Sequence, residues 1–341
     1  MNHVSHLVPV AKIIFGIITG TALITTSDDK SNDAALVGVR YFIHDAVVPL
    51  ASAPLPPQEY QIAGVTPSTI YLNSLLSPPR LLALDHRLRK TCESTIRLDT
   101  SIHSFFDRHT IIVDSPRLYL MDGAAPLVAC GRVDTPAIDH TLDNSRYFSS
   151  ALALPGGRIL FSLHPDKNKQ SPFTLKTYGG EKILDMPPHP GGRFIRDPRS
   201  LLIVYVYSGA TRFIGMDSCF QLLYNRNTIG NSGLQKPIAD FPPGITLTGK
   251  TEPDQPWTGC LDENRIFICS GGMSKKETYE HNRPTTVIDV YSAGDGTYTG
   301  SFRLPAIREH KIKSFQVFNG TLFVLYEDRI VVYRLDPSKF C

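Results

Sequence analysis

The stretch that decides the fold is YQIAGVTPSTIYLNSLLSPPRLLALDHRLRKTCESTIRL, residues 60–98. It consists of short apolar runs separated by Pro, Asn and Ser, and no part of it has the 3.6-residue period of an amphipathic helix. Pro67, Pro78 and Pro79 fall between the runs, where a strand would not need their missing N–H groups. The stretch predicts four strands, Tyr60–Val65, Ser68–Leu72, Arg80–Asp85 and Glu93–Leu98.

The same four-strand unit recurs along the chain. Its second strand occurs six times, at intervals of about 42 to 63 residues, first as STIYL and then as PRLYLMD, GGRILFSLH, RSLLIVYVYSG, NRIFICSGG and NGTLFVLYED. Repeats of this length, each with four short strands, are typical of a β-propeller. We therefore predict an all-β fold, a six-bladed β-propeller preceded by one N-terminal hydrophobic helix.

The sixth copy is incomplete, because RIVVYRLDPSKFC ends the chain after its third strand. An unpaired outer edge would remain unless another segment supplied the fourth strand. The segment ALVGVRYFI, Ala35–Ile43, has the alternating pattern of a strand and lies outside the six sets. We expect it to close the last blade, so that the propeller covers residues 35–341.

The segments YQIAGVTPSTIYL, PRLLALD, RLYLMDG and TLFVLYEDRIVVYRLD carry a resemblance to known proteins. The chain resembles six-bladed β-propellers of the TolB-like and NHL-like kind, and especially uncharacterised membrane-anchored propellers of Bacteroidetes-type bacteria. The resemblance implies a fold and an exported location. It brings no catalytic residues with it, because no motif of an enzyme family is matched.

The N-terminus is the strongest local signal for location. We predict that residues 1–27 form a signal anchor or signal peptide, because Lys12 is the only charge between residues 7 and 27, and that residues 28–34 form a polar linker. No A-x-A cleavage site follows the apolar core, which favours an uncleaved anchor through residues 7–26. The charge distribution favours a cytoplasmic N-terminus, so we expect the propeller on the periplasmic side of the cytoplasmic membrane.

Charge and cysteine content exclude several classes of function. The chain has 35 Lys and Arg against 32 Asp and Glu, a net charge of +3, and no basic stripe, so no nucleic-acid partner is predicted. Its six cysteines show no zinc-type spacing. A hairpin turning at residues 261–264 would leave Cys260 and Cys269 about 13 Å out of register, too far for a disulfide between them.

Candidate ligand-binding residues are polar side chains expected at the mouth of the central channel, where the loops that lead into the inner strands converge. They are His109, Asp114, Arg193, Arg196, Asp197, Asp262, Glu263 and His310. Their spacing is irregular, and ordinary turn and rim positions explain it more simply than a metal site does. The lone Trp257 could stack on a ligand, although packing between blades is the simpler interpretation.

These observations favour a membrane-tethered, extracytoplasmic propeller that acts as a protein-binding or assembly module without catalysis. Two alternatives remain open, a metal-dependent hydrolase or lyase in the channel, and a propeller that binds glycans or cell-envelope polymers. No cofactor is predicted, the protein partner is not identified, and the sequence leaves the oligomeric state open.

Overall fold

Apart from one short 3-10 helix, η2 (Pro337–Phe340), the regular elements in the described part of the chain are β-strands. The computed structural model describes residues 40–341 except 75–77, 98–109, 123–126, 144–146, 156–157, 164–172, 178–179, 185–191, 198, 208–211, 230–258, 271–285, 306, 308–311 and 341. Residues 1–39, which include the predicted anchor and linker, lie outside this part.

The described strands form six four-stranded antiparallel sheets. Sheet 1 contains β2 (Tyr60–Val65), β3 (Thr69–Ser74), β4 (Arg80–Asp85) and β5 (Lys90–Thr95). Sheet 2 contains β6 (Thr110–Asp114), β7 (Arg117–Asp122), β8 (Leu127–Arg132) and β9 (Ile138–Asp143). Sheet 3 contains β10 (Phe148–Leu154), β11 (Arg158–Leu163), β12 (Phe173–Thr177) and β13 (Gly180–Leu184).

Sheet 4 contains β14 (Gly192–Arg196), β15 (Ile203–Tyr207), β16 (Arg212–Met216) and β17 (Leu222–Asn227). Sheet 5 contains β18 (Gly259–Asp262), β19 (Arg265–Ser270), β20 (Val287–Ser292) and β21 (Tyr298–Arg303). Sheet 6 contains β22 (Ile312–Phe318), β23 (Thr321–Tyr326), β24 (Arg329–Leu335) and, from the other end of the chain, β1 (Val47–Pro54).

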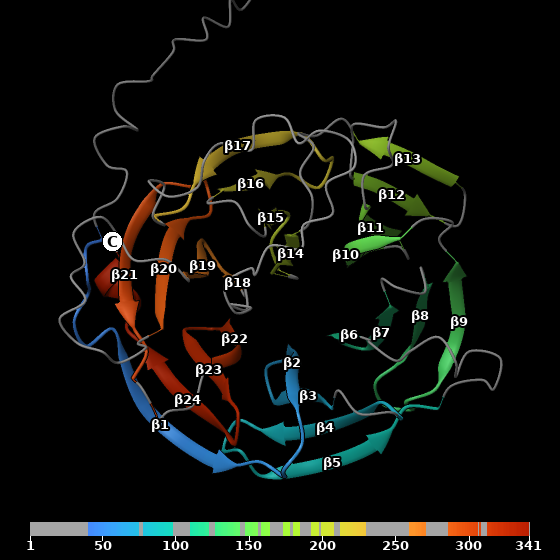
Figure 1. Cartoon of the computed structure of the whole chain (residues 1–341), viewed down its shortest axis with the longest axis horizontal. Helices are drawn as coiled ribbons and strands as arrows, with labels where there is room; N and C mark the ends of the chain where they lie inside the picture. The colour runs from blue at the N-terminus through green and yellow to red at the C-terminus, as the bar shows by residue number, and fades with distance from the viewer. Residues whose placement is uncertain are drawn as a thin grey trace, which may run out of the picture. The chain divides into compact units, whose positions relative to one another are not determined.

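The sheets stand around a common centre, with the first strand of each sheet innermost and the fourth at the rim (Figure 1). The buried apolar side chains form six clusters, and each cluster lies between two consecutive sheets, including one between sheets 6 and 1. Since every sheet buries both faces against its neighbours, the predicted all-β propeller fold is confirmed.

Burial on both faces explains why the second strands read as continuous apolar runs. All five residues of β15 are buried, whereas β5, at the rim of sheet 1, is exposed along almost its whole length. A strand between two packed layers needs apolar side chains at every position, while an outer strand does not. Because of this difference, the second strand of each sheet was the easiest element to predict from the sequence.

The strand that completes sheet 6 is β1, which pairs antiparallel with β24 from Val47 opposite Leu335 to Pro54 opposite Arg329 (Figure 1). The prediction that Ala35–Ile43 supplies this strand was therefore wrong. Pro49 and Pro54 would be unfavourable inside a sheet, but an outermost strand has one edge without a partner, where proline is tolerated. The pairing also shifts register between Pro49 and Ala51.

The end of the segment first expected to close the ring lies instead beside the rim of sheet 5. Phe42 forms a single parallel bridge with Ser301 of β21, and the backbone N–H of Ile43 donates to the Ser301 carbonyl at 2.8 Å. Residues 35–39 lie outside the described part. The described end of the segment, residues 40–43, therefore contacts sheet 5 rather than sheet 6.

A buried ion pair holds this segment in place. The Arg40 guanidinium donates to the Asp289 carboxylate of β20 at 2.9 Å, and the exposed fractions of the two side chains are 1% and 0%. The Ser301 hydroxyl donates to the same carboxylate at 2.6 Å. We call this set the N-terminal latch.

Strand limits in sheet 1 follow the prediction closely. β2 and β4 match it, whereas β5 begins at Lys90 rather than Glu93. The reason is a tight turn in which the Asp85 carboxylate accepts the backbone N–H groups of Arg87 and Arg89 at 3.0 and 2.8 Å. A turn closed by its own first residue lets the next strand start early.

No disulfide bond links two cysteines in the described part of the chain, and Cys260 and Cys269 are both free thiols, as predicted for this pair. The expected register was wrong, because Cys260 lies opposite Phe267 rather than Arg265.

Among the described residues, no helix has the length and apolar character needed to cross a membrane.

Candidate functional site

The first strands of the six sheets surround a central cavity of about 880 Å³. Sites for small ligands commonly have volumes of about 300–1,000 Å³. The six strands are β2, β6, β10, β14, β18 and β22. We call the end of the central cavity where these strands begin the leading end, and the end where they finish the trailing end.

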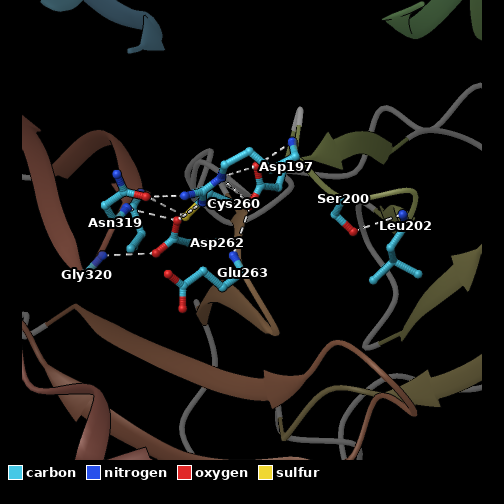
Figure 2. Close-up of polar contacts among 10 residues, drawn as sticks. Asp197, Ser200, Leu202, Cys260, Asp262, Glu263, Asn319 and Gly320 are labelled. Carbon is cyan, nitrogen blue, oxygen red and sulfur yellow. Dashed lines mark hydrogen bonds and ion pairs between the residues drawn. The ribbon is translucent and has the colours of Figure 1, made fainter. Parts of the chain in front are cut away.

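At the trailing end, one arginine joins two buried carboxylates. Figure 2 shows the two carboxylates, Asp197 and Asp262. The Arg199 guanidinium donates to Asp197 at 2.7 Å and to Asp262 at 2.5 Å. Asp197 follows β14 and Asp262 ends β18, so the contact connects sheets 4 and 5. We call this group the arginine clamp.

The arginine clamp also reaches sheet 6. The backbone N–H groups of Asn319 and Gly320, in the turn after β22, donate to the Asp262 carboxylate at 3.0 and 3.1 Å. Both residues have positive φ, 48° and 68°, which turns two consecutive N–H groups toward one acceptor. The Arg199 guanidinium lies 4.9 Å from the ring centre of Phe318. Three sheets are thus held together at one point.

The local sequence Asp197-Pro198-Arg199 sets up this geometry. The Asp197 carboxylate accepts the backbone N–H of Arg199 at 2.9 Å and that of Glu263 at 3.0 Å. The Asp197 carboxylate therefore has two roles: it closes the turn that begins at Asp197, and it binds the Arg199 side chain. The described residues contain no group of three His, Cys, Asp or Glu side chains placed to hold a metal ion. With its carboxylates occupied by donors, the arginine clamp fits a structural role.

The pKa of Asp197 is below its ordinary value. Burial of this carboxyl, which is 2% exposed, opposes ionisation, but hydrogen bonds from the Arg199 side chain and from the N–H groups of Arg199 and Glu263 outweigh that effect. Hydrogen bonds from the Arg199 guanidinium to the carboxylates of Asp197 and Asp262 raise the pKa of Arg199. The ionised form of Asp197 is therefore the one that the fold stabilises.

The substitution Asp197→Asn is expected to lower the free energy of unfolding at pH 7 by about 2 kcal/mol, because it weakens charge-assisted hydrogen bonds. Since the pKa of Asp197 is lower in the folded than in the unfolded protein, its contribution is complete above about pH 4 and is lost as the pH falls further. Urea unfolding of both proteins between pH 7 and pH 3 measures the difference, which should narrow below pH 4. A constant difference would contradict this assignment.

A second ion pair crosses the central cavity wall at the trailing end. Arg196, at the end of β14, lies 3.7 Å from the Asp114 carboxylate at the end of β6, and it donates to the Ala153 carbonyl at 3.2 Å. These two predicted residues come from sheets that are not consecutive, 2 and 4. Their contact spans β10 and brings together groups 82 positions apart in the sequence.

The other predicted residues are distributed differently. Glu263 is exposed and, with Asp262, lines a smaller cavity of about 130 Å³ beside the arginine clamp. Arg193 lines the central cavity near the leading end, at the second position of β14. His109, Trp257 and His310 lie outside the described residues. Most of the described candidates therefore lie at the trailing end rather than where loops lead into the inner strands.

Sequence reasoning missed the cation that organises the trailing end. Arg199 was passed over because it lies outside a strand and carries no motif. The available signal was the segment RDPRS, residues 196–200, in which an Asp two positions before an Arg favours a turn closed by the carboxylate. Lys313, Thr110 and Gln61, which line the central cavity, were also missed, because their common position emerges only when the strands are aligned.

Comparisons with known proteins support the fold alone. No protein-family model matches the chain, and no curated protein matches it either. Among solved structures, a member of the DUF4221 family from Bacteroides vulgatus aligns with a TM-score of 0.52 and 11% identity, covering 86% of this chain and 99% of that one. At this identity the likeness is evidence of a shared β-propeller fold and of nothing finer.

Two further structures are similar at lower scores. The Pan2 WD40 domain of Neurospora crassa aligns with a TM-score of 0.48 and 8% identity over 86% of this chain and 97% of that one. Hsv2 of Kluyvelomyces marxianus aligns with a TM-score of 0.43 and 7% identity over 76% and 86% of the two chains.

Proposed function

We propose that this chain is a binding module for a protein partner, without catalysis, built as a six-bladed propeller of the TolB-like or NHL-like kind. The observation that carries the proposal is the exposure of three leucines in or beside the connections between strands of sheet 4. Leu201 is 77% exposed, Leu222 46% and Leu223 53%. We call these three side chains the leucine patch.

The leucine patch lies at one end of sheet 4. Leu201 is in the connection from β14 to β15, and Leu222 and Leu223 begin β17, directly after the turn from β16. Because the strands of the sheet are antiparallel, both connections are at the trailing end. Single exposed apolar residues are ordinary, whereas several on neighbouring turns of one sheet are typical of an interaction surface.

The turns that present these leucines are fixed by their own carboxylates. The Asp217 carboxylate accepts the N–H groups of Cys219 and Gln221 at 2.8 and 2.9 Å, in the turn that precedes Leu222. Asp197, whose carboxylate belongs to the arginine clamp, holds the start of the connection that contains Leu201. A surface ordered before binding loses less conformational entropy when a partner arrives.

The proposal includes a location. Residues 7–26 would tether the propeller to the cytoplasmic membrane, with the propeller on the periplasmic side. Support comes from the apolar N-terminal segment and the polar residues that follow it. A tethered module needs only modest affinity, because confinement to one membrane raises the effective concentration of its partner.

Replacing the leucine patch by serine, as Leu201→Ser, Leu222→Ser and Leu223→Ser together, is expected to weaken partner binding at least about tenfold. The physical reason is the loss of three apolar contacts from one surface, while folding should be nearly unchanged because the side chains are exposed. The measurement is affinity capture from solubilised membranes with the full chain, with quantitative recovery of the partner compared between the variant and the unaltered chain.

The matched control is Val48→Ser with Leu50→Ser, two residues of β1 that are 40% and 58% exposed on a different sheet. Recovery of the same partner by this control and its loss with the leucine variant supports the proposal. A chain that captures no partner, or a partner captured equally by all three proteins, contradicts it. The same fractions test the tether, since the full chain should stay with membranes and residues 40–341 alone should not.

A further inference from the structure

The leading end of the central cavity carries a ring of polar side chains. The ring positions are the first or second residues of the inner strands, and all of them line the central cavity. They are Gln61 of β2, Thr110 of β6, Ser149 of β10, Arg193 of β14, Gly259 of β18 and Lys313 of β22. Among these six described positions two are cationic and none is a carboxylate.

Arg193 differs from the other arginines near it. Three residues further along the chain Arg196 lies beside Asp114, and Arg199 binds two carboxylates. Arg193 has no ion pair and no side-chain hydrogen bond with any described residue. Its side chain is exposed to the central cavity, and the protein atoms around it desolvate the guanidinium in part, which lowers its pKa. A guanidinium in such surroundings is stabilised by an anion.

Lys313, the second residue of β22 as Arg193 is of β14, provides a second cation in the cavity lining. Its ammonium lies 3.7 Å from the Glu327 carboxylate, and the two side chains are 42% and 44% exposed. A pair with this separation and exposure is weak and can exchange for another anion. Between the strands of Arg193 and Lys313 the ring position is Gly259, which has no side chain to separate the two cations.

Neutral donors and an aromatic ring complete the surface. The side chains of Thr110 and Gln61 form no hydrogen bond with a described residue, so both can donate to a ligand. Tyr147, which precedes β10, lines the central cavity and is 60% exposed. Deeper in the wall, the half-buried ring of Phe194 offers apolar surface. An oxyanion with an organic group attached matches this combination of side chains.

We propose that the leading end of the central cavity binds a small organic anion through a phosphate or carboxylate group held by Arg193 and Lys313. Thr110 and Gln61 donate hydrogen bonds to the same group, and the rest of the ligand lies against Tyr147 and Phe194. The site is separate from the leucine patch, which lies at the trailing end, so the two proposals are tested independently.

The experiment titrates the full chain with inorganic phosphate and with citrate, each compared with sodium chloride at equal ionic strength. Calorimetry gives the affinity, and thermal unfolding gives the stabilisation. We expect one anion class to bind, and Arg193→Gln to weaken that binding about tenfold or more, because it removes charge-assisted hydrogen bonds. Lys313→Gln should weaken it less. The control is Arg87→Gln, an exposed arginine in the turn after β4, which should bind as the unaltered chain does.

Folding of the unliganded variant provides the second measurement. Because Arg193 has no counter-charge among the described residues, Arg193→Gln should unfold at the same or a higher urea concentration than the unaltered chain when no phosphate or citrate is present. A fall in this midpoint would assign Arg193 a structural role and overturn the proposal. So would failure of both anions to bind, or equal binding by the Arg193→Gln and Arg87→Gln variants.

Discussion

A chain that lacks residues 1–54 is expected to lose its cooperative unfolding transition and to aggregate. The deletion removes β1, the strand that completes sheet 6, and leaves the outer edge of β24 without a partner. It also removes Ala51 and Ala53, which pack against the apolar cluster between sheets 6 and 1. Urea unfolding followed by circular dichroism, together with size-exclusion chromatography, measures the effect.

The matched control is deletion of residues 1–39, which keeps β1 and the N-terminal latch and removes no contact among the described residues. This shorter deletion should unfold cooperatively, close to the midpoint of the full chain. A synthetic peptide of residues 44–55 should restore folding of the longer deletion by adding the missing strand, and a scrambled peptide should not. A cooperative transition in the longer deletion without the peptide would show that the closing strand is dispensable.

Arg40→Ala is expected to lower the free energy of unfolding by about 3–5 kcal/mol, the usual effect of removing one partner from a buried ion pair. The substitution leaves the Asp289 carboxylate, which is fully buried, without the guanidinium that lies 2.9 Å away. Among the described residues, the Ser301 hydroxyl alone would remain as its side-chain donor. Urea or guanidinium unfolding at pH 7 gives the difference.

The comparison variant is Arg80→Ala, because Arg80 is 49% exposed and lies 3.8 Å from Glu93. An exposed pair of this kind contributes about 0–1 kcal/mol. Equal destabilisation by the two variants would mean that burial of the N-terminal latch has no energetic effect. The double variant Arg40→Leu with Asp289→Leu should be more stable than Arg40→Ala, since it removes the unpaired charge as well.

The sequence was most informative where burial dictates composition. The strand Ile203–Tyr207, buried at each position, could be located from its apolar run alone. The strand Val47–Pro54 could not be located in this way, because its only distinguishing feature is its pairing with β24. Its two prolines are compatible with a strand only because it lies at the outer edge of its sheet. The local pattern of apolar residues therefore predicts the buried strands well and the rim strands poorly.

The candidate site shows the same division. Asp114 and Asp262 could be proposed from their places at strand ends, but their partners come from other sheets and depend on the alignment of strands around the central cavity. The absence of a partner for Arg193 among the described residues is likewise a property of three-dimensional structure. A sequence shows which charges exist, whereas the fold decides which of them are neutralised.

The pairing of β1 with β24 also determines when the sixth sheet can form during synthesis of the chain. Val47 leaves the ribosome about 290 residues before its partner Leu335, an interval of roughly 15–60 s at ordinary translation rates. During that time the first strand has no edge to join, and the sixth sheet cannot form. A ring whose sixth sheet pairs β1 with β24 can be completed only after β24 has been synthesised, so β1 stays without its partner while all the strands between them are made.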